Sequence, residues 1–177
     1  MGQALSQQSL SSLIWSVADL LRGDYRQSDY GKVILPFIVL RRLDCVLAPT
    51  KEAVLAEYEA RKKSGVNPEP FLLRKAGQSF FNTSAMDLRK LVGDPDHIRE
   101  NLLAYIHAFS PSVRDIFDRF AFDKQVEFLS SQRLLYKITE KFAAIDLHPD
   151  KVSNAEMGHV FEELIRKFAE LSNETAG

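Results

Sequence analysis

Residues that commonly carry catalysis are few in this sequence. The four histidines, His97, His107, His148 and His159, include no pair at the four-residue spacing that puts two metal ligands on one helix face. The pattern H-E-x-x-H is absent, and so are the glycine-rich patterns that hold the phosphates of dinucleotides and nucleoside triphosphates. We therefore expect no catalytic, cofactor-binding or metal-binding residue in this chain.

Cys45 is the single cysteine. As a nucleophile it would need a nearby histidine, which the sequence cannot show, and we favour a small buried thiol within a helix. A single cysteine also excludes an internal disulfide framework and suits the reducing cytoplasm. No apolar run is long enough to span a bilayer, and the N-terminus has no secretory signal. We expect a cytoplasmic protein that has no contact with a membrane.

The basic side chains of the sequence are suited to bind phosphate groups. Five of them lie at positions 22–42, against three aspartates at positions 24, 29 and 44, which leaves a local excess of two positive charges. Arg41 and Arg42, aided by Lys32, are placed to contact DNA phosphates. The alternative is that the two arginines pair with Asp44 and neighbouring residues, or only keep that face of the helix soluble. The residues that we name as candidates for DNA contact are Arg26, Lys32, Arg41, Arg42, Arg74 and Lys75.

The chain as a whole is close to neutral, with 23 lysines and arginines against 24 aspartates and glutamates. Proteins that bind nucleic acid through their overall charge are strongly basic, so any such contact here has to come from a local patch. The aromatic residues between positions 109 and 128 could stack on bases, but their helical spacing favours a place in the core. At 177 residues the chain is long enough for one domain with its own core.

The hydrophobic pattern predicts helices along most of the chain. Residues 33–40 (VILPFIVL) are ambiguous, because their β-branched side chains also suit a buried strand. Pro36 cannot donate to a central β-ladder, so we favour one amphipathic helix over residues 29–47 with Pro36 in its interior. The predicted fold is all-α, an irregular bundle of about eight or nine helices, with at most a very short strand pair near residues 77–83.

Several helix starts are marked by capping residues. Ser153 and Glu156 match the S-x-x-E capping box and open a long C-terminal helix. Ser84 is the expected N-cap of a helix that Gly93 ends. Ser110-Pro111 combines a capping side chain with proline at the first helical position.

Residues 20–47 resemble the opening segment of the modification (methyltransferase) subunit of type I restriction–modification systems. Two further blocks agree with that family: FFNTS at residues 80–84, and a long block at residues 134–168 that ends in FEELIRKF. The resemblance covers nearly the whole chain. Its first block comprises Tyr30, Val33, Ile34, Phe37, Leu40, Arg41, Arg42 and Leu43.

The resemblance implies that residues 1–177 form the N-terminal helical domain of a longer subunit. Residues 150–177 are then expected to form a helix that leads towards a catalytic domain. Residues 1–8 are expected to be disordered because they are polar and terminal. In that family the catalytic domain binds S-adenosylmethionine and methylates adenine at N6 through an N-P-P-[FY] motif. This chain contains neither that motif nor the glycine-rich cofactor loop, so no catalytic or cofactor residue is carried over to it.

The resemblance also implies partners. The expected ones are a specificity subunit, a second modification subunit and a restriction subunit, with DNA bound by the assembled complex. The helical domain is expected to help clamp DNA and to contribute to assembly. The alternative hypothesis is a free-standing helical module for protein interaction or regulation, without methyltransferase activity.

Overall fold

The computed structural model describes residues 2–176, with the side chains of residues 10–171 and 173. Within this part the chain is helical, and its only extended pairings are two isolated bridges. The predicted all-α class is therefore confirmed, with ten α-helices in the described residues. In chain order they are α1 (Gly2–Leu21), α2 (Gly31–Leu47), α3 (Lys51–Lys62), α4 (Glu69–Ala76), α5 (Leu88–Val92), α6 (Ile98–His107), α7 (Pro111–Arg119), α8 (Phe122–Ser131), α9 (Leu135–Ala143) and α10 (Asn154–Ala176), with the 3-10 helices η1 (Gln27–Asp29), η2 (Ala48–Thr50) and η3 (Pro95–His97).

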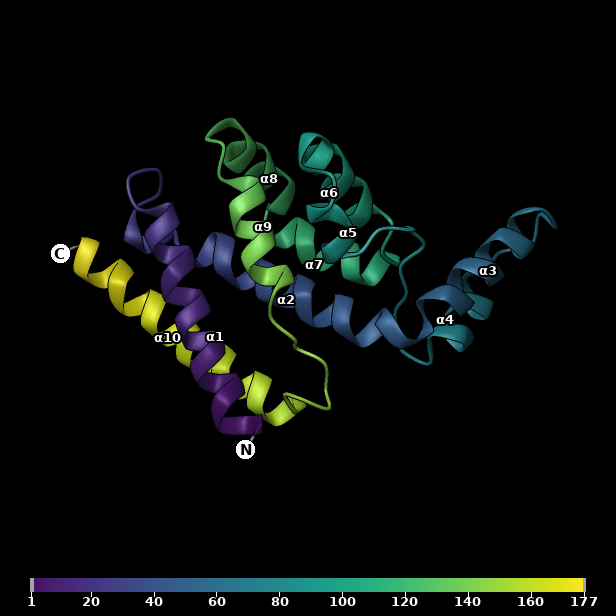
Figure 1. Cartoon of the computed structure of the whole chain (residues 1–177), viewed down its shortest axis with the longest axis horizontal. Helices are drawn as coiled ribbons and strands as arrows, with labels where there is room; N and C mark the ends of the chain where they lie inside the picture. The colour runs from purple at the N-terminus through teal and green to yellow at the C-terminus, as the bar shows by residue number, and fades with distance from the viewer. Residues whose placement is uncertain (1, 177) are drawn as a thin grey trace.

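Helix α2 is the central element of the fold. It contacts α8, α9 and α10, and Figure 1 shows it running through the middle of the molecule. The helix predicted over residues 29–47 is confirmed, with Pro36 in its interior. The polar face expected at Arg41, Arg42 and Asp44 is wrong, however, because these side chains are buried. The less buried stripe of the helix consists of exposed Lys32 followed by half-buried apolar residues, Leu35, Val39, Leu43 and Val46.

Aromatic rings pack around the middle of α2. Phe37 is fully buried, stacks on Phe142 of α9 with ring centroids 5.2 Å apart, and meets Phe122 of α8 edge-on at 5.0 Å. Phe117 of α7 continues this cluster through Phe122. The prediction that the aromatic segment at residues 109–128 belongs to the core is confirmed for these rings, whereas Phe128 is 38% exposed.

The segment before α5 is tied to the junction of α6 and α7. Asn82 pairs with Phe109 in an isolated bridge, which is all the extended structure that forms near residues 77–83. The hydroxyl of Ser110 accepts a hydrogen bond from the Phe81 N–H at 3.1 Å instead of capping α7. The cap predicted at Ser84 is also wrong, because Asp87 occupies that position and its Oδ1 accepts from the Lys90 N–H at 2.8 Å.

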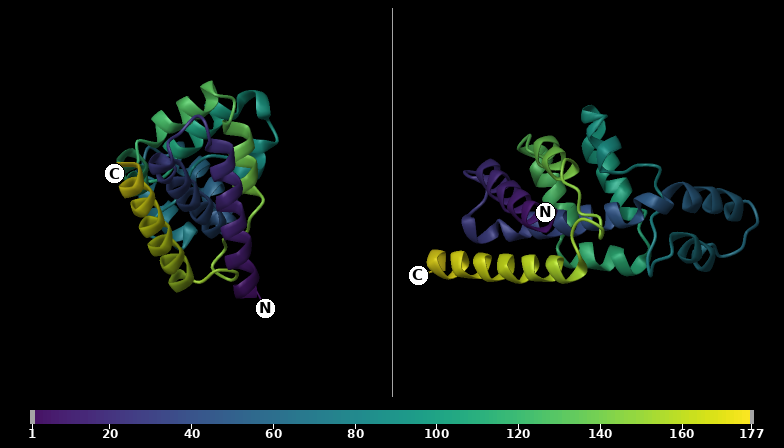
Figure 2. Two further views of the ribbon diagram at one scale, coloured as in Figure 1. Left: turned by 90° about the vertical axis from the view of Figure 1, so that its left-hand side faces the viewer. Right: turned by 60° about the horizontal axis from the view of Figure 1, so that its bottom comes forward.

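Helices α3 and α4 form a two-helix hairpin, which we call the arm. It projects from the C-terminal end of α2 and stands away from the other helices (Figures 1 and 2). The two helices contact each other, and buried Val54, Leu72 and Ala76 fill the space between them and the body. The arm therefore presents most of its side chains to solvent.

Helix α10 packs along η1 and α2 (Figure 2, right). The predicted capping box is confirmed, because Ser153 and Glu156 exchange hydrogen bonds of 3.0 and 3.1 Å. Gly31 permits the close approach: a Cβ at this position would lie 3.1 Å from Cδ2 of Phe168. The expected disorder of residues 1–8 falls partly outside the described residues, since Met1 and the side chains of the first nine residues are not described, and the backbone of residues 2–8 begins α1.

Candidate functional site

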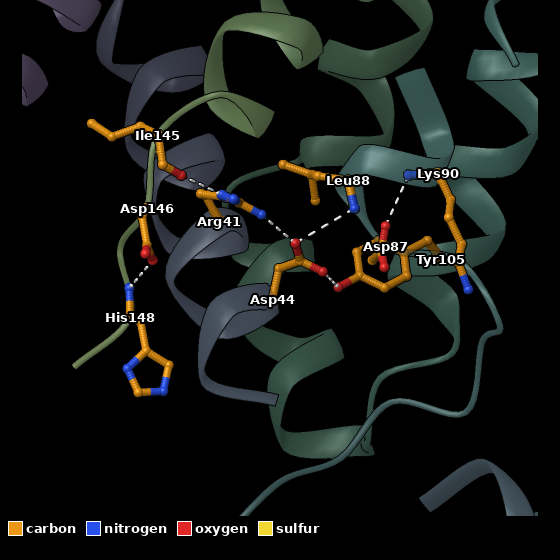
Figure 3. Close-up of polar contacts among 9 residues, drawn as sticks. All are labelled: Arg41, Asp44, Asp87, Leu88, Lys90, Tyr105, Ile145, Asp146 and His148. Carbon is orange, nitrogen blue, oxygen red and sulfur yellow. Dashed lines mark hydrogen bonds and ion pairs between the residues drawn. The ribbon is translucent and has the colours of Figure 1, made fainter. Parts of the chain in front are cut away.

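Arg41 and Asp44 form a buried ion pair on α2, with 2.7 Å between Nη1 and Oδ2 (Figure 3). Both side chains are less than a tenth exposed. Arg41 also donates from Nε to the backbone carbonyl of Ile145, just beyond α9, at 2.7 Å. The guanidinium is therefore occupied inside the fold, where it joins α2 to the segment that follows α9.

The carboxylate of Asp44 on α2 accepts hydrogen bonds from two other helices, α5 and α6. The Tyr105 hydroxyl of α6 donates to Oδ1 at 2.6 Å, and the backbone N–H of Leu88 of α5 donates to Oδ2 at 3.4 Å (Figure 3). Burial raises the pKa of Asp44, while the Tyr105 hydrogen bond and the charge of Arg41 act against that shift. Burial also raises the pKa of Tyr105 well above its usual value, which keeps the hydroxyl protonated as a donor.

Arg42 is the second buried arginine of α2. Its Nη1 donates to the carbonyls of Leu147 and Val152 at 2.7 and 2.5 Å, and its Nη2 donates to Oδ1 of Asn154 at 2.7 Å. These acceptors are two residues of the connection from α9 to α10 and the first residue of α10. Arg42 thus fastens that connection, and with it the start of α10, to the central helix.

Arg41 therefore corresponds to the alternative in which it pairs with Asp44, whereas Arg42 binds distant acceptors that the sequence analysis does not predict. In this arrangement neither guanidinium faces solvent, and neither can reach a phosphate without leaving its buried acceptors. Two further candidates lie near η1 and are exposed: Arg26, and Lys32, whose Nζ lies 3.0 Å from Oδ1 of Asp29. The basic stretch around α2 is thus divided between the interior and the surface.

Arg74 and Lys75 lie in the last turn of α4, on the arm, and are exposed. The structure does not bring them together with Arg26 and Lys32, which lie at the opposite end of α2 (Figure 1). It does place Arg74 beside Phe71, and Arg61 of α3 against the same ring. Arg61 and Phe71 are absent from the sequence-based candidates, although the spacing of Phe71 and Arg74, three residues apart on a helix, was a usable signal.

The remaining residues with possible chemistry lie apart from one another. Each histidine is paired with one carboxylate, as in His107 with Asp123 at 2.7 Å, and among the described residues no group of three His, Cys, Asp or Glu could hold a metal ion. Cys45 is buried, as predicted, and burial raises the pKa of its thiol. A thiol with a raised pKa forms little of the reactive thiolate at neutral pH.

A groove of about 670 Å³ lies between α1 and α10. Its lining is mainly apolar and includes Trp15, which is 55% exposed and has Nζ of Lys167 at 6.0 Å from its ring. The charged residues along its rim are mixed in sign, and several are already paired, such as Arg22 with Asp19. The groove therefore has hydrophobic surface but no group placed for catalysis.

The fold and these sites define a class: an all-helical domain, held by buried arginine networks, with no catalytic constellation in the part that the structure describes. No described helix has the length and apolar character needed to cross a membrane. The family model of the HsdM N-terminal domain matches residues 10–142. The chain belongs to this family, the N-terminal domains of the methyltransferase subunits of type I restriction–modification systems. Neither the curated proteins nor the solved structures gave a match.

Proposed function

We propose that this chain is the non-catalytic N-terminal domain of a modification subunit whose catalytic domain methylates adenine at N6 in DNA, using S-adenosylmethionine. The observation that carries the proposal is the family match over residues 10–142. In this role the domain contributes to assembly with a specificity subunit, a second modification subunit and a restriction subunit. It also helps the assembled complex to enclose DNA.

Two physical features support a role in assembly rather than in chemistry. Buried hydrogen bonds from Arg41 and Arg42 fasten the segment between α9 and α10 to the central helix, which ties the start of α10 to the body. The net charge of −1 suits a domain that shares DNA binding with partners, because affinity for DNA depends on how many phosphates a protein neutralises.

Co-elution of purified components tests the proposal. The chain is mixed with its cognate specificity subunit and with a modification subunit from which the region equivalent to residues 10–142 has been removed. We expect all three to elute together in size-exclusion chromatography, with a mass that includes the helical domain. A chain that elutes alone under conditions in which the other two associate contradicts the proposal and favours a free-standing interaction module.

A further inference from the structure

Charge is distributed unevenly between the arm and the body. Residues 51–76, which comprise the arm, carry six basic and four acidic side chains, whereas the remainder of the chain carries 17 basic and 20 acidic ones. The arm is thus net positive and the rest of the molecule net negative. Because the arm also projects from the body (Figures 1 and 2), its cations stand apart from most of that negative charge. A polyanion is attracted to such an element and repelled by the body.

Two guanidinium groups on the arm share one aromatic ring. The Cζ atom of Arg61 lies 3.7 Å from the centre of the Phe71 ring, and that of Arg74 lies 5.8 Å from the same centre. Stacking of a guanidinium on an aromatic face restricts its orientation without consuming its hydrogen-bond donors. Arg61 is thus at stacking distance from the ring and Arg74 is at the outer range of a cation–π contact, so both cations contact one ring.

Most guanidinium N–H donors of this pair have no acceptor among the described residues. Nε of Arg61 donates to Glu57 at 3.1 Å, and the guanidinium groups of Arg61 and Arg74 make no other hydrogen bond or ion pair to the described residues. Two positive charges are thus balanced by one carboxylate. Lys63 and Lys75 stand nearby in the sequence, both exposed and without an ion-pair partner in the described part of the chain.

The simplest explanation of cations at these positions is helix stabilisation, since basic residues in the last turn of a helix interact well with its dipole. That accounts for Arg61 and Arg74 being basic, but not for their meeting at one ring from two different helices. A planar guanidinium with two free N–H groups matches the oxygens of a phosphate. Paired arginines on a projecting hairpin suit a backbone with regularly spaced phosphates better than an isolated anion.

We propose that the arm, through Arg61, Phe71 and Arg74, contacts the phosphate backbone of duplex DNA. The contact is independent of DNA sequence, because phosphates carry no base information. This inference rests on the proposed function for the choice of DNA as the polyanion. It identifies the arm, and not the buried arginines of α2, as the part of the chain that meets DNA.

The test is DNA binding by the chain, measured by fluorescence anisotropy of a labelled duplex over a series of salt concentrations. We expect Arg74→Glu with Lys75→Glu to weaken binding at low salt by about tenfold or more, and to reduce the slope of log K against log salt by about two. The matched control is Lys124→Glu with Lys137→Glu, two exposed residues of α8 and α9. This control changes the net charge equally, and we expect less than about a twofold loss. An equal loss in the two double variants would show diffuse electrostatics and overturn the proposal.

A second variant tests the shared ring. Phe71→Leu keeps an apolar side chain and the net charge but removes the surface on which both guanidiniums stack. We expect weaker DNA binding by about two- to fivefold with an unchanged far-ultraviolet circular dichroism spectrum. Unchanged affinity, with the fold intact, contradicts the preorganised contact.

The outcome separates this inference from the proposed function. Failure of the wild-type chain to bind duplex DNA at low salt would overturn the proposal for the arm. Displacement of the DNA by polyglutamate as effectively as by unlabelled duplex would also overturn it, in favour of an acidic protein partner. Co-elution with the specificity and truncated modification subunits is a separate readout. The proposed DNA contact of the arm can therefore be wrong while the proposed function remains supported.

Discussion

The side chain of Arg42 reaches the first residue of α10, where Nη2 donates to Oδ1 of Asn154 at 2.7 Å across 112 positions of sequence. The same guanidinium binds the carbonyls of Leu147 and Val152. One buried arginine therefore joins the connection after α9 and the first residue of α10 to the central helix.

The first prediction concerns this contact. Arg42→Met keeps much of the side-chain volume but removes every donor, and the buried carbonyls of Leu147 and Val152 lose their partner. We expect a loss of about 2–4 kcal/mol in the free energy of unfolding, measured by urea denaturation. Faster amide hydrogen exchange should appear at residues 147–157. Lys137→Met, at an exposed position, is the control and should change stability by less than about 0.5 kcal/mol. Equal stability of the two variants would contradict the assigned role of Arg42.

The second prediction separates a buried hydroxyl from an exposed one. Tyr105→Phe removes the 2.6 Å hydrogen bond to Asp44, and Tyr136→Phe removes a 3.1 Å hydrogen bond to Glu140 at the surface. We expect the first substitution to cost about 1.5–3 kcal/mol, because a buried carboxylate loses a donor. The second should have little measurable effect on the denaturation midpoint. The reverse order would show that Asp44 does not depend on Tyr105.

The third prediction follows from the raised pKa of Asp44, which is caused chiefly by burial. A carboxyl whose pKa is higher in the folded than in the unfolded state binds more protons when folded, so its contribution to stability is present below the unfolded pKa and is lost as pH rises through the folded pKa. Wild type should therefore lose stability relative to Asp44→Asn as pH increases from about 4 to about 7. Urea denaturation of both proteins across this range measures the difference. If the stability of the wild type instead rises relative to that of Asp44→Asn with increasing pH, the charge of Arg41 outweighs burial and lowers the pKa of Asp44.

These networks also show the limits of prediction from sequence. The helix over residues 29–47 could be predicted because its apolar run is long and Pro36 excludes a central strand. The burial of Arg41 and Arg42 could not, because their acceptors at Ile145 and Leu147 lie more than a hundred positions away. The sequence shows two adjacent arginines, but it does not show the backbone carbonyls that accept their hydrogen bonds.

The helix caps and the arm also show that local features can be predicted from sequence and that contacts between distant residues cannot. The capping box of Ser153 and Glu156 is local, so its three-residue spacing sufficed to predict it. Asp87 caps α5, whereas the hydroxyl of Ser84 accepts a hydrogen bond from the Met86 N–H in a turn that precedes the helix. The meeting of Arg61 and Arg74 at one ring depends on how the hairpin folds back, which no local pattern contains.

The fourth prediction uses backbone strain. Ala121 has φ of 52° at the start of α8, a left-handed conformation that costs a residue with a Cβ about 1 kcal/mol. Ala121→Gly should therefore raise stability by up to about 1 kcal/mol, measured as a higher denaturation midpoint. The same substitution at Ala104, an exposed interior position of α6, should lower stability by about 1 kcal/mol. Destabilisation at both sites would contradict the strain at Ala121.

The central claim, that this domain serves a methyltransferase without performing the chemistry, is tested most directly by transfer of labelled methyl groups. The chain is added to its specificity subunit and to a modification subunit that lacks the region equivalent to residues 10–142, together with DNA and S-adenosylmethionine. We predict no methylation by the chain alone and restored adenine-N6 methylation in the mixture. Methyl transfer by the chain alone, or no restoration in a mixture where all three proteins are folded, would contradict the account.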